Sequence, residues 1–320
     1  MTVIAADIGG SKTLLGCFAE PGKALHAVRF DNHEARDASD ILHRYLHQHA
    51  AIHPAESTLV LAIAGPVQDQ RHCQMTNLPW QLDAGQLQAE FGFRQVILLN
   101  DLEATAWAMP GLAATDQILL NQKPLRFEKP VTVISVGTGL GEALLLPDQQ
   151  EGWRVVASEA GHKSFAPFDP ASAALLQKTL VNDDVAISWE DWFSGSGLPR
   201  LYRAMFPAAH ALDSAAITQQ ATSLADSHAA ACIALFVRGL FAEAGNTALQ
   251  YWSEGGVIFA GGVAQHLQHW FRDRAIQRTF SAKSRHQAWL GSVPLALCSN
   301  TEAALHGAAA YGWHQQMRGN

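Results

Sequence analysis

The sequence is poor in cysteine and has no Cys-x-x-Cys pair. Its four cysteines, Cys17, Cys73, Cys232 and Cys298, are scattered along 320 residues. Structural zinc sites need closely spaced cysteine or histidine ligands, and disulfide frameworks form in oxidising compartments. The cysteine pattern therefore argues against both and favours a reducing cytoplasm.

Long apolar runs are also missing. The longest candidate, residues 229–237, lies between His228 and Arg238, whereas a membrane-spanning helix needs about 20 apolar residues. No basic segment precedes the first apolar run, as a secretory signal requires. We expect a protein that is neither exported nor anchored, with no membrane partner.

Basic charge is scarce. The chain has 22 Lys and Arg against 29 Asp and Glu, a formal net charge of −7, and no Lys/Arg-rich block. Nucleic-acid-binding surfaces are basic, so we expect no nucleic-acid partner. Apolar residues make up 48% of the chain, and the length suggests about two domains, each with its own core.

The chain opens with a glycine turn between two strand-like runs. Residues 2–6 and 13–18 are the runs, and Asp7-Ile8-Gly9-Gly10-Ser11-Lys12 joins them. A dinucleotide fingerprint would have a helix after its glycines, so this is a hairpin, whose N–H groups can face a phosphate. A plain turn is the alternative.

Strands and helices then alternate up to residue 110. Apolar runs at 58–64 and 95–99 read as buried strands, and residues 37–49 and 83–91 have helical spacing. Together with a third leading strand at 27–30 they predict an α/β layer.

The run 95–99 stops on an amide and a carboxylate, Asn100 and Asp101. Ligands of open α/β sheets gather at the carboxyl ends of strands, so these side chains are site candidates. The alternative is that Asp101 only N-caps a helix at 102–109, which Pro110 ends.

The second half repeats the opening plan. A strand at 131–136, the turn Gly137-Thr138-Gly139-Leu140-Gly141 and a strand at 143–146 match the first 18 residues. This is a faint internal duplication. Two such loops could grip one polyphosphate from both sides.

Further candidates follow this repeat. Glu159 and His162 stand three residues apart. Glu190 lies in the first turn of a helix that Ser188 begins. The alternative role of Glu190 is to complement the dipole of that helix. Gly261 and Gly262 follow a strand and either let a flat ring approach the backbone or form a tight turn. We expect helices at 215–252 and at 301–314, the last crossing back onto the first domain.

In this order and spacing, five motifs make the chain resemble the bacterial glucokinase family over nearly its whole length. They are Asp7-Ile8-Gly9-Gly10, Asn100-Asp101, Gly137-Thr138-Gly139-Leu140-Gly141, Glu159-Ala160-Gly161-His162 and Ala260-Gly261-Gly262-Val263. The resemblance implies an α/β protein of two ribonuclease H-like (actin-like ATPase) domains around a cleft. It implies a small domain of residues 1–110 plus 301–320, a large domain of 111–300 and a homodimer.

The resemblance also implies substrates and roles: ATP and Mg²⁺ serve the transfer of the γ-phosphoryl group to the 6-hydroxyl of glucose, with Asp101 as general base. Asp7 would orient the magnesium through water. The sugar ligands implied are Asn100, Asp101, Glu159, His162, Glu190 and Gly65. The nucleotide ligands implied are Asp7, Ile8, Gly9, Gly10, Ser11, Lys12, Gly137, Thr138 and Gly139, with Gly261 and Gly262 near the adenosine.

Two departures leave alternatives open. Ser11-Lys12 stands where bacterial glucokinases commonly carry Thr-Asn and is closer to the Thr-Lys of ROK sugar kinases, whereas no clustered cysteines follow His162 as they do in ROK proteins. One alternative is therefore a ROK-type kinase of another hexose or an N-acetylated hexose. Another is a non-catalytic sugar-sensing regulator, although Asp7 lies too near the start for the preceding helix-turn-helix that we would expect.

Overall fold

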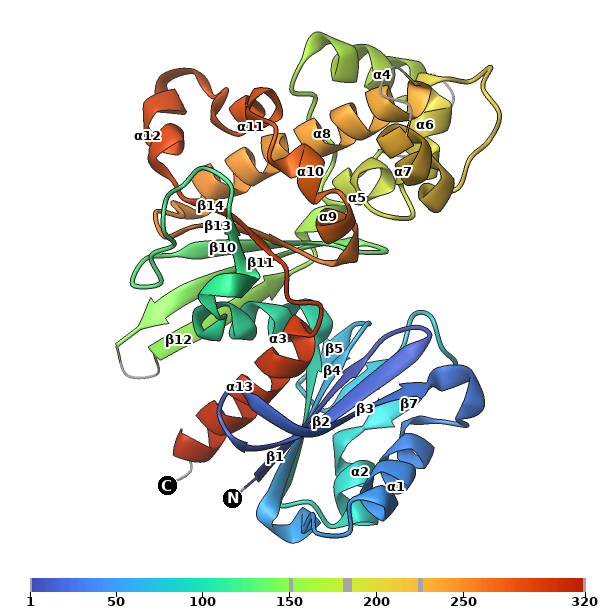
Figure 1. The fold of residues 1–320 in the computed structure, drawn as a ribbon, viewed down its shortest axis with the longest axis vertical. Helices are drawn as coiled ribbons and strands as arrows, with labels where there is room; N and C mark the ends of the chain where they lie inside the picture. Colours follow the sequence, from blue (N-terminus) through green and yellow to red (C-terminus); the bar gives the residue numbers. More distant parts are fainter. Residues whose placement is uncertain (1, 150–151, 181–185, 224–226, 319–320) are drawn as a thin grey trace. The chain divides into compact units, whose positions relative to one another are not determined.

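The computed structural model describes residues 2–149, 152–180, 186–223 and 227–318. The chain forms two compact units, each with its own sheet and core (Figure 1). Unit 1 comprises Met1–Ala113 and Glu302–Asn320, and unit 2 comprises Ala114–Thr301.

Unit 1 is built on a five-stranded sheet with the order β3-β2-β1-β4-β8. Its strands are β1 (Thr2–Ile8), β2 (Lys12–Glu20), β3 (Lys23–Asp31), β4 (Ser57–Ile63) and β8 (Gln95–Asn100). β1, β4 and β8 run parallel, whereas β2 and β3 are antiparallel additions. Every residue of β4 is buried, as expected of a central strand covered on both faces.

Two pairs of helices cover this sheet. On one face, Ile4, Ala6 and Ile8 share a core with α1 (Ala38–Gln48) and α2 (Ala84–Phe91). α13 (Ala303–Arg318) contacts α3 (Asp101–Ala108), β1 and β4, and its Gly312 lies against Val3 and Val60 of the other face. A small three-stranded sheet is added by β5 (Val67–Gln68), β6 (His72–Gln74) and β7 (Gln81–Asp83).

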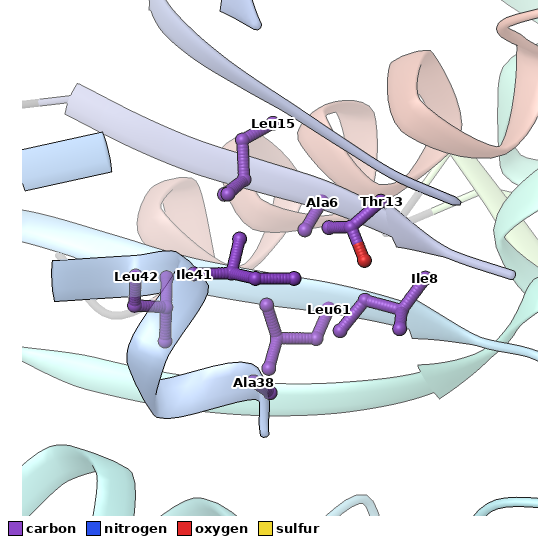
Figure 2. Close-up of a pocket in the computed structure, with 8 residues that line it drawn as sticks. All are labelled: Ala6, Ile8, Thr13, Leu15, Ala38, Ile41, Leu42 and Leu61. Atoms are coloured by element: carbon purple, nitrogen blue, oxygen red, sulfur yellow. The ribbon is translucent and has the colours of Figure 1, made fainter. Parts of the chain in front are cut away.

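A small cavity lies between this sheet and α1. Figure 2 shows its lining, in which Thr13 carries the only side-chain oxygen among seven apolar side chains. Its volume of about 10 Å³ is close to the minimum for a single water, so it is a packing gap rather than a substrate site.

Unit 2 is built on a six-stranded sheet with the order β12-β11-β10-β13-β14-β9. Its strands are β9 (Gln117–Leu119), β10 (Val131–Val136), β11 (Leu140–Asp148), β12 (Gly152–Ser158), β13 (Gly256–Ala260) and β14 (Leu295–Cys298). Its helices are α4 (Pro170–Leu180), α5 (Trp189–Phe193), α6 (Leu198–Met205), α7 (Ser214–Ser223), α8 (His228–Tyr251), α9 (Gly262–His266), α10 (Gln268–Phe271), α11 (Arg274–Ser281) and α12 (Gln287–Ser292).

The two sheets share one plan of strand pairing. β1 and β10 each pair antiparallel with the strand that follows the glycine turn and parallel with a strand from later in the chain. The outer strands also correspond. β3 of unit 1 occupies the place of β12 in unit 2, and β8 occupies the place of β14. The duplication predicted from the two glycine hairpins is thus confirmed in the topology.

Two expected helices differ from the structure. The expected helix at 102–109 begins at Asp101 and ends at Ala108, because the side chain of Asn100 supplies the N-cap. The expected helix at 215–252 is two helices, α7 and α8, and Ser227 caps the second through the N–H of Ala230.

α8 is the longest helix among the described residues. Its 24 residues reach the length and hydropathy of a membrane-spanning helix, but 78% of its most apolar window is buried inside unit 2. Such burial is typical of the central helix of a globular core. The four cysteines are buried and free.

Candidate active site

Strand register brings the candidate residues of unit 1 to one edge of its sheet. Ile8 of β1 pairs with Ile63 of β4, and Ile63 pairs in turn with Asn100 of β8. The carboxyl ends of these three parallel strands are therefore level, which places Asp7 and Asp101 at the edge where open α/β sheets bind ligands.

Asn100 is fixed in place by its two side-chain groups. Its Oδ1 accepts hydrogen bonds from the N–H groups of Leu102 (3.0 Å) and Glu103 (3.4 Å), and its Nδ2 donates to the carbonyl oxygen of Gly65 (3.2 Å). Asn100 thus ties the end of β8 to the end of β4. The alternative in which Asp101 is the helix cap is wrong, because Asn100 is the cap.

Asp101 is the first residue of α3, and its carboxylate lies at the positive end of that helix. Its Oδ1 accepts a hydrogen bond from the N–H of Leu102 at 2.8 Å. A helix N-terminus stabilises negative charge. This position and the hydrogen bond from Leu102 orient the carboxylate of Asp101.

Asp7 has an unusual protonation equilibrium. Burial, together with the negative charges of Asp101 and Glu302, raises its pKa to about 6, against an opposing effect of Arg29. The negative charge of Asp101 thus contributes to the raised pKa of Asp7. Mg²⁺ is usually held by one or two carboxylates, with water and phosphate oxygens completing its shell. Asp7 beside Asp101 fits such an ion.

The first glycine turn is held from within and from one buried side chain. The N–H of Gly9 donates to the carbonyl oxygen of Lys12 (3.0 Å), while Asn32 donates its Nδ2 to the carbonyl of Gly9 (2.8 Å) and its backbone N–H to that of Ser11 (2.9 Å). Asn32 is 2% exposed and also accepts from the hydroxyl of Thr13. The turn is therefore preorganised.

The residues of this turn differ in what they present. Ser11 and Lys12 are exposed. Ile8 packs its side chain into the core, and its carbonyl oxygen accepts from the N–H of Ala64. Ile8 therefore has no side chain available to a ligand, and its role is to hold Asp7 and Gly9 in place. Gly10 lies close to Asn77, whose Cβ would be 3.1 Å from a Cβ at residue 10.

The second glycine turn is supported by residues 194–197. The N–H of Gly137 donates to the carbonyl of Gly139 (3.0 Å), and the N–H of Gly195 donates to the carbonyl of Gly137 (2.8 Å). Ser196 donates both its N–H and its hydroxyl to the carbonyl of Thr138, each at 3.0 Å. The carbonyl groups of this turn are thereby directed toward that segment.

Glu159, His162 and Glu190 lie together in unit 2. His162 Nε2 is 3.8 Å from Glu159 Oε2 and 3.8 Å from Glu190 Oε1. The side chain of Glu159 is 81% exposed and that of Glu190 is 28% exposed. The group thus combines one free-standing carboxylate, one imidazole and one half-buried carboxylate.

Glu190 also contacts the glycine turn. Its Oε2 accepts a hydrogen bond from the N–H of Leu140 at 2.8 Å, and it would lie 2.6 Å from a Cβ at Gly139. Asp191, not Glu190, completes the capping box with Ser188. Stabilising the helix dipole therefore does not account for the orientation of Glu190.

An aromatic cluster anchors the helix that carries Glu190. Phe165 packs against Trp189, Trp192 and Phe193, with ring centroids 4.7, 5.1 and 5.4 Å away. Such ring pairs contribute about 0.5–1.5 kcal/mol each beyond their buried area. α5 has only five residues, so this packing supplies the rigidity that its length does not.

Gly261 and Gly262 have different constraints. Gly261 has φ +92°, and a Cβ there would collide with the carbonyl of Val136, whereas Gly262 begins α9 with open space around it. The tight strand-to-helix turn is thus observed at Gly261. Approach of a flat ring remains an expectation.

Comparison with known proteins identifies the family. The glucokinase family model matches residues 4–315. The chain belongs to the glucokinase family. Glucokinase from Synechocystis sp. is 31% identical over 96% of each chain. The crystal structure of a glucokinase from an Antarctic psychrotroph has TM-score 0.87 at 27% identity, covering 98% of each chain.

A more distant structure shares the fold. It is a ROK family glucokinase from Streptomyces griseus in complex with glucose and AMPPNP, with TM-score 0.66 and 20% identity, covering 98% of this chain and 99% of that one. The predicted pair of actin-like ATPase-type domains is confirmed by these matches. The glucokinase reading of the sequence is likewise confirmed: the chain is an ATP-dependent enzyme that phosphorylates glucose.

Sequence reasoning missed the residues that hold the two glycine turns. Asn32 supports the first turn and Ser196 supports the second, through hydrogen bonds to backbone carbonyl groups. The one available signal for Asn32 was its place in the polar pair Asp31-Asn32 that follows the strand-like run 27–30.

Proposed function

We propose that the glucokinase-family activity of this chain transfers the γ-phosphoryl group of ATP to the 6-hydroxyl of glucose, with Asp101 as the general base. The observation that carries this proposal is the shared strand edge, where Asp101 begins α3 and influences the pKa of Asp7. Phosphoryl transfer depends mainly on positioning and charge stabilisation, so an oriented carboxylate and a phosphate-binding turn are the groups required.

Asp101 accepts the proton of the sugar hydroxyl as that oxygen attacks the γ-phosphorus. Its place in the first turn of α3, where Leu102 N–H donates to Oδ1, fixes the direction of the carboxylate. General-base catalysis contributes about 10²–10⁴ in rate. Alignment of the hydroxyl with phosphorus contributes more, about 7–11 kcal/mol, so binding of the sugar is the larger part of the chemistry.

The sugar hydroxyls bind Asn100, Asp101, Glu159, His162 and Glu190, with the backbone at Gly65 nearby. Asn100 already bonds Gly65, and His162 already lies within 4 Å of both glutamates. A sugar site of this kind rejects analogues that lack a hydroxyl, because polar groups that the bound sugar covers would then be left unpaired.

The phosphates bind the turn residues Gly9, Gly10, Ser11, Lys12, Gly137, Thr138 and Gly139. Asp7 would hold Mg²⁺, as the family resemblance implies through water, and the ion would offset the negative charge of the phosphates. The exposed Lys12 adds a positive charge to the first turn. Gly261 and Gly262 lie near the adenosine.

The two compact units are the small and large domains of this kinase. Their boundaries near residues 113 and 301 support that division. We assign the protein to the cytoplasm, to glycolysis and to a homodimeric state, on the basis of its family.

The test is an assay of the purified protein with ATP, Mg²⁺ and a panel of sugars, following ADP release. Coupling to a dehydrogenase specific for glucose 6-phosphate identifies the position phosphorylated. We expect the highest kcat/KM with glucose and no activity without Mg²⁺. Preference for another hexose or an N-acetylated hexose would favour the ROK-type alternative, and binding without turnover would favour a sensor.

A further inference from the structure

Two buried glutamates flank one lysine in unit 2. Lys163 Nζ is 3.1 Å from Glu142 Oε2 and 2.6 Å from Glu243 Oε1, and the glutamate side chains are 1% and 2% exposed. Thr247 also donates its hydroxyl to Glu142 (3.1 Å), and Asn246 donates its Nδ2 to Glu243 (2.8 Å). We call Glu142, Lys163 and Glu243 the buried triad.

The triad is electrostatically unusual. Burial and the charge of Glu243 raise the pKa of Glu142 to about 7, although Lys163 opposes this. Burial lowers the pKa of Lys163, but its bonds to the two carboxylates outweigh burial and raise that pKa overall. One ammonium group is therefore shared by two buried carboxylates.

Such a triad is a poor device for stability alone. Buried ion pairs and triads are often no more stable than apolar side chains of similar volume, since desolvation offsets their attraction. What they can supply is a defined geometry, because each hydrogen-bonding partner accepts only a narrow range of positions. The position of Lys163 in the chain indicates which segments the triad holds in place.

Lys163 connects the two segments that carry the proposed sugar ligands. It follows His162 directly, and its backbone N–H donates to the carbonyl of Ala160 (3.0 Å), closing the turn after Glu159. Its carbonyl oxygen accepts from the N–H of Trp189 (3.0 Å), the residue before Glu190. The next residues continue this link, since Ser164 bridges to Ser188.

We propose that Lys163 is a positioning residue that sets the spacing of His162 and Glu190 for the sugar, with Glu142 and Glu243 as its fixed anchors. This inference rests on the proposed roles of His162 and Glu190. Glu142 extends the argument to the glycine turn, because it lies on β11 two residues after Leu140, whose N–H binds Glu190.

The test compares steady-state kinetics of full-length variants. Lys163→Met alone would leave two buried carboxylates without a cation, so it is combined with Glu142→Gln and Glu243→Gln, which keep shape and remove all three charges. We expect the KM for glucose to rise about tenfold, with kcat and the KM for ATP within about twofold of wild type. Lys163→Arg keeps the positive charge. Its KM for glucose should therefore lie closer to the wild-type value than to that of the triple variant.

Lys163→Gln is the second variant, because it can still hydrogen-bond one carboxylate and uptake of one proton restores the wild-type net charge of the triad. The matched control is Lys129→Met, which removes another lysine–glutamate pair of unit 2, that of Lys129 with Glu254 at 3.4 Å. It should leave the glucose KM unchanged.

The inference fails if either triad variant folds with wild-type secondary structure and keeps the wild-type KM for glucose, even at a lower melting temperature. Failure of the underlying function would be seen differently, as a wild-type enzyme that releases no ADP with glucose. The two outcomes are therefore separable in one series of assays.

Discussion

The side-chain amide of Asn32 donates a hydrogen bond to the backbone carbonyl of Gly9 at 2.8 Å. Asn32 is buried and lies 23 residues further along the chain. The shape of the first glycine turn is thus set in part from outside the turn, by one residue that donates to the carbonyl groups of both Gly9 and Ser11.

Asn32→Ala should weaken nucleotide use more than sugar use. It leaves the carbonyl of Gly9 and the hydroxyl of Thr13 without this partner, at a cost of about 1–3 kcal/mol in the free energy of unfolding. We expect the KM for ATP to rise several-fold more than the KM for glucose. Thr13→Val removes only the hydroxyl partner of Asn32 and serves as the control, and equal changes in both KM values would contradict the argument.

Asp101→Asn should separate chemistry from binding. The amide keeps the size of the carboxylate but cannot accept the proton, so we expect kcat to fall by about 10²–10⁴. The dissociation constant for glucose, measured by calorimetry, should change little. Glu103→Gln, in the same helical turn, is the control and should keep kcat within about twofold of wild type. Near-normal turnover of Asp101→Asn would make Asp101 a structural residue.

Glu190→Gln should raise the KM for glucose. The amide oxygen can still accept the hydrogen bond from Leu140, but the charge beside His162 is lost. The neighbouring Asp191→Asn removes a carboxylate that closes the capping box and pairs with Arg200 at 2.9 Å, without touching Leu140 or the glycine turn. That change should cost about 1 kcal/mol of stability and leave the glucose KM as it is. An unaltered glucose KM in Glu190→Gln would remove Glu190 from the sugar site.

Gly261→Ala and Gly262→Ala form a matched pair. Alanine at 261 must adopt φ +92° and meet the carbonyl of Val136, whereas alanine at 262 has open space. Forcing a non-glycine residue into such a backbone region costs about 1–3 kcal/mol, before the collision is counted. Thermal denaturation should show a clear loss of melting temperature for the first variant and almost none for the second.

Asp7→Asn should change stability in a pH-dependent way. Asp7 has its pKa raised from 3.8 to about 6, so the folded state binds this proton more tightly than the unfolded chain does. The stability that this proton supplies is present below about pH 4 and is lost as the pH rises through 6. Relative to wild type, Asp7→Asn should therefore gain stability across this range, by at most about 3 kcal/mol. Parallel pH–stability curves for the two proteins would refute the raised pKa.

Most of the strands and both glycine hairpins could be predicted from the sequence, because each has a signal in a short stretch of residues. Apolar runs identified β1, β4, β8, β10 and β13, and the glycines between strand-like runs identified both hairpins. The edge position of Asn100 also followed from where its apolar run ends. Each of these features depends on neighbours within a few residues, where periodicity and turn preference are informative.

The residues that escaped prediction are held by distant partners. Asn32 and the segment 194–197 shape the glycine turns through hydrogen bonds that span 23 and 58 residues. Glu142 and Glu243 are buried although charged residues normally lie at the surface. Each stands alone inside an apolar strand or helix, a pattern that marks a buried charge but not its partner.

The packing of α13 on α3 bears on how the protein matures during synthesis. Gly307 of α13 has no room for a side chain beside the carbonyl of Ala104, so the two helices touch at their backbones. α13 leaves the ribosome only after all of unit 2. Unit 2 is contiguous in the chain and can fold as it emerges, whereas the layer behind the helix that bears Asp101 is completed last. A released chain that ends at Thr301 should therefore hold a finished second unit and an unfinished first one.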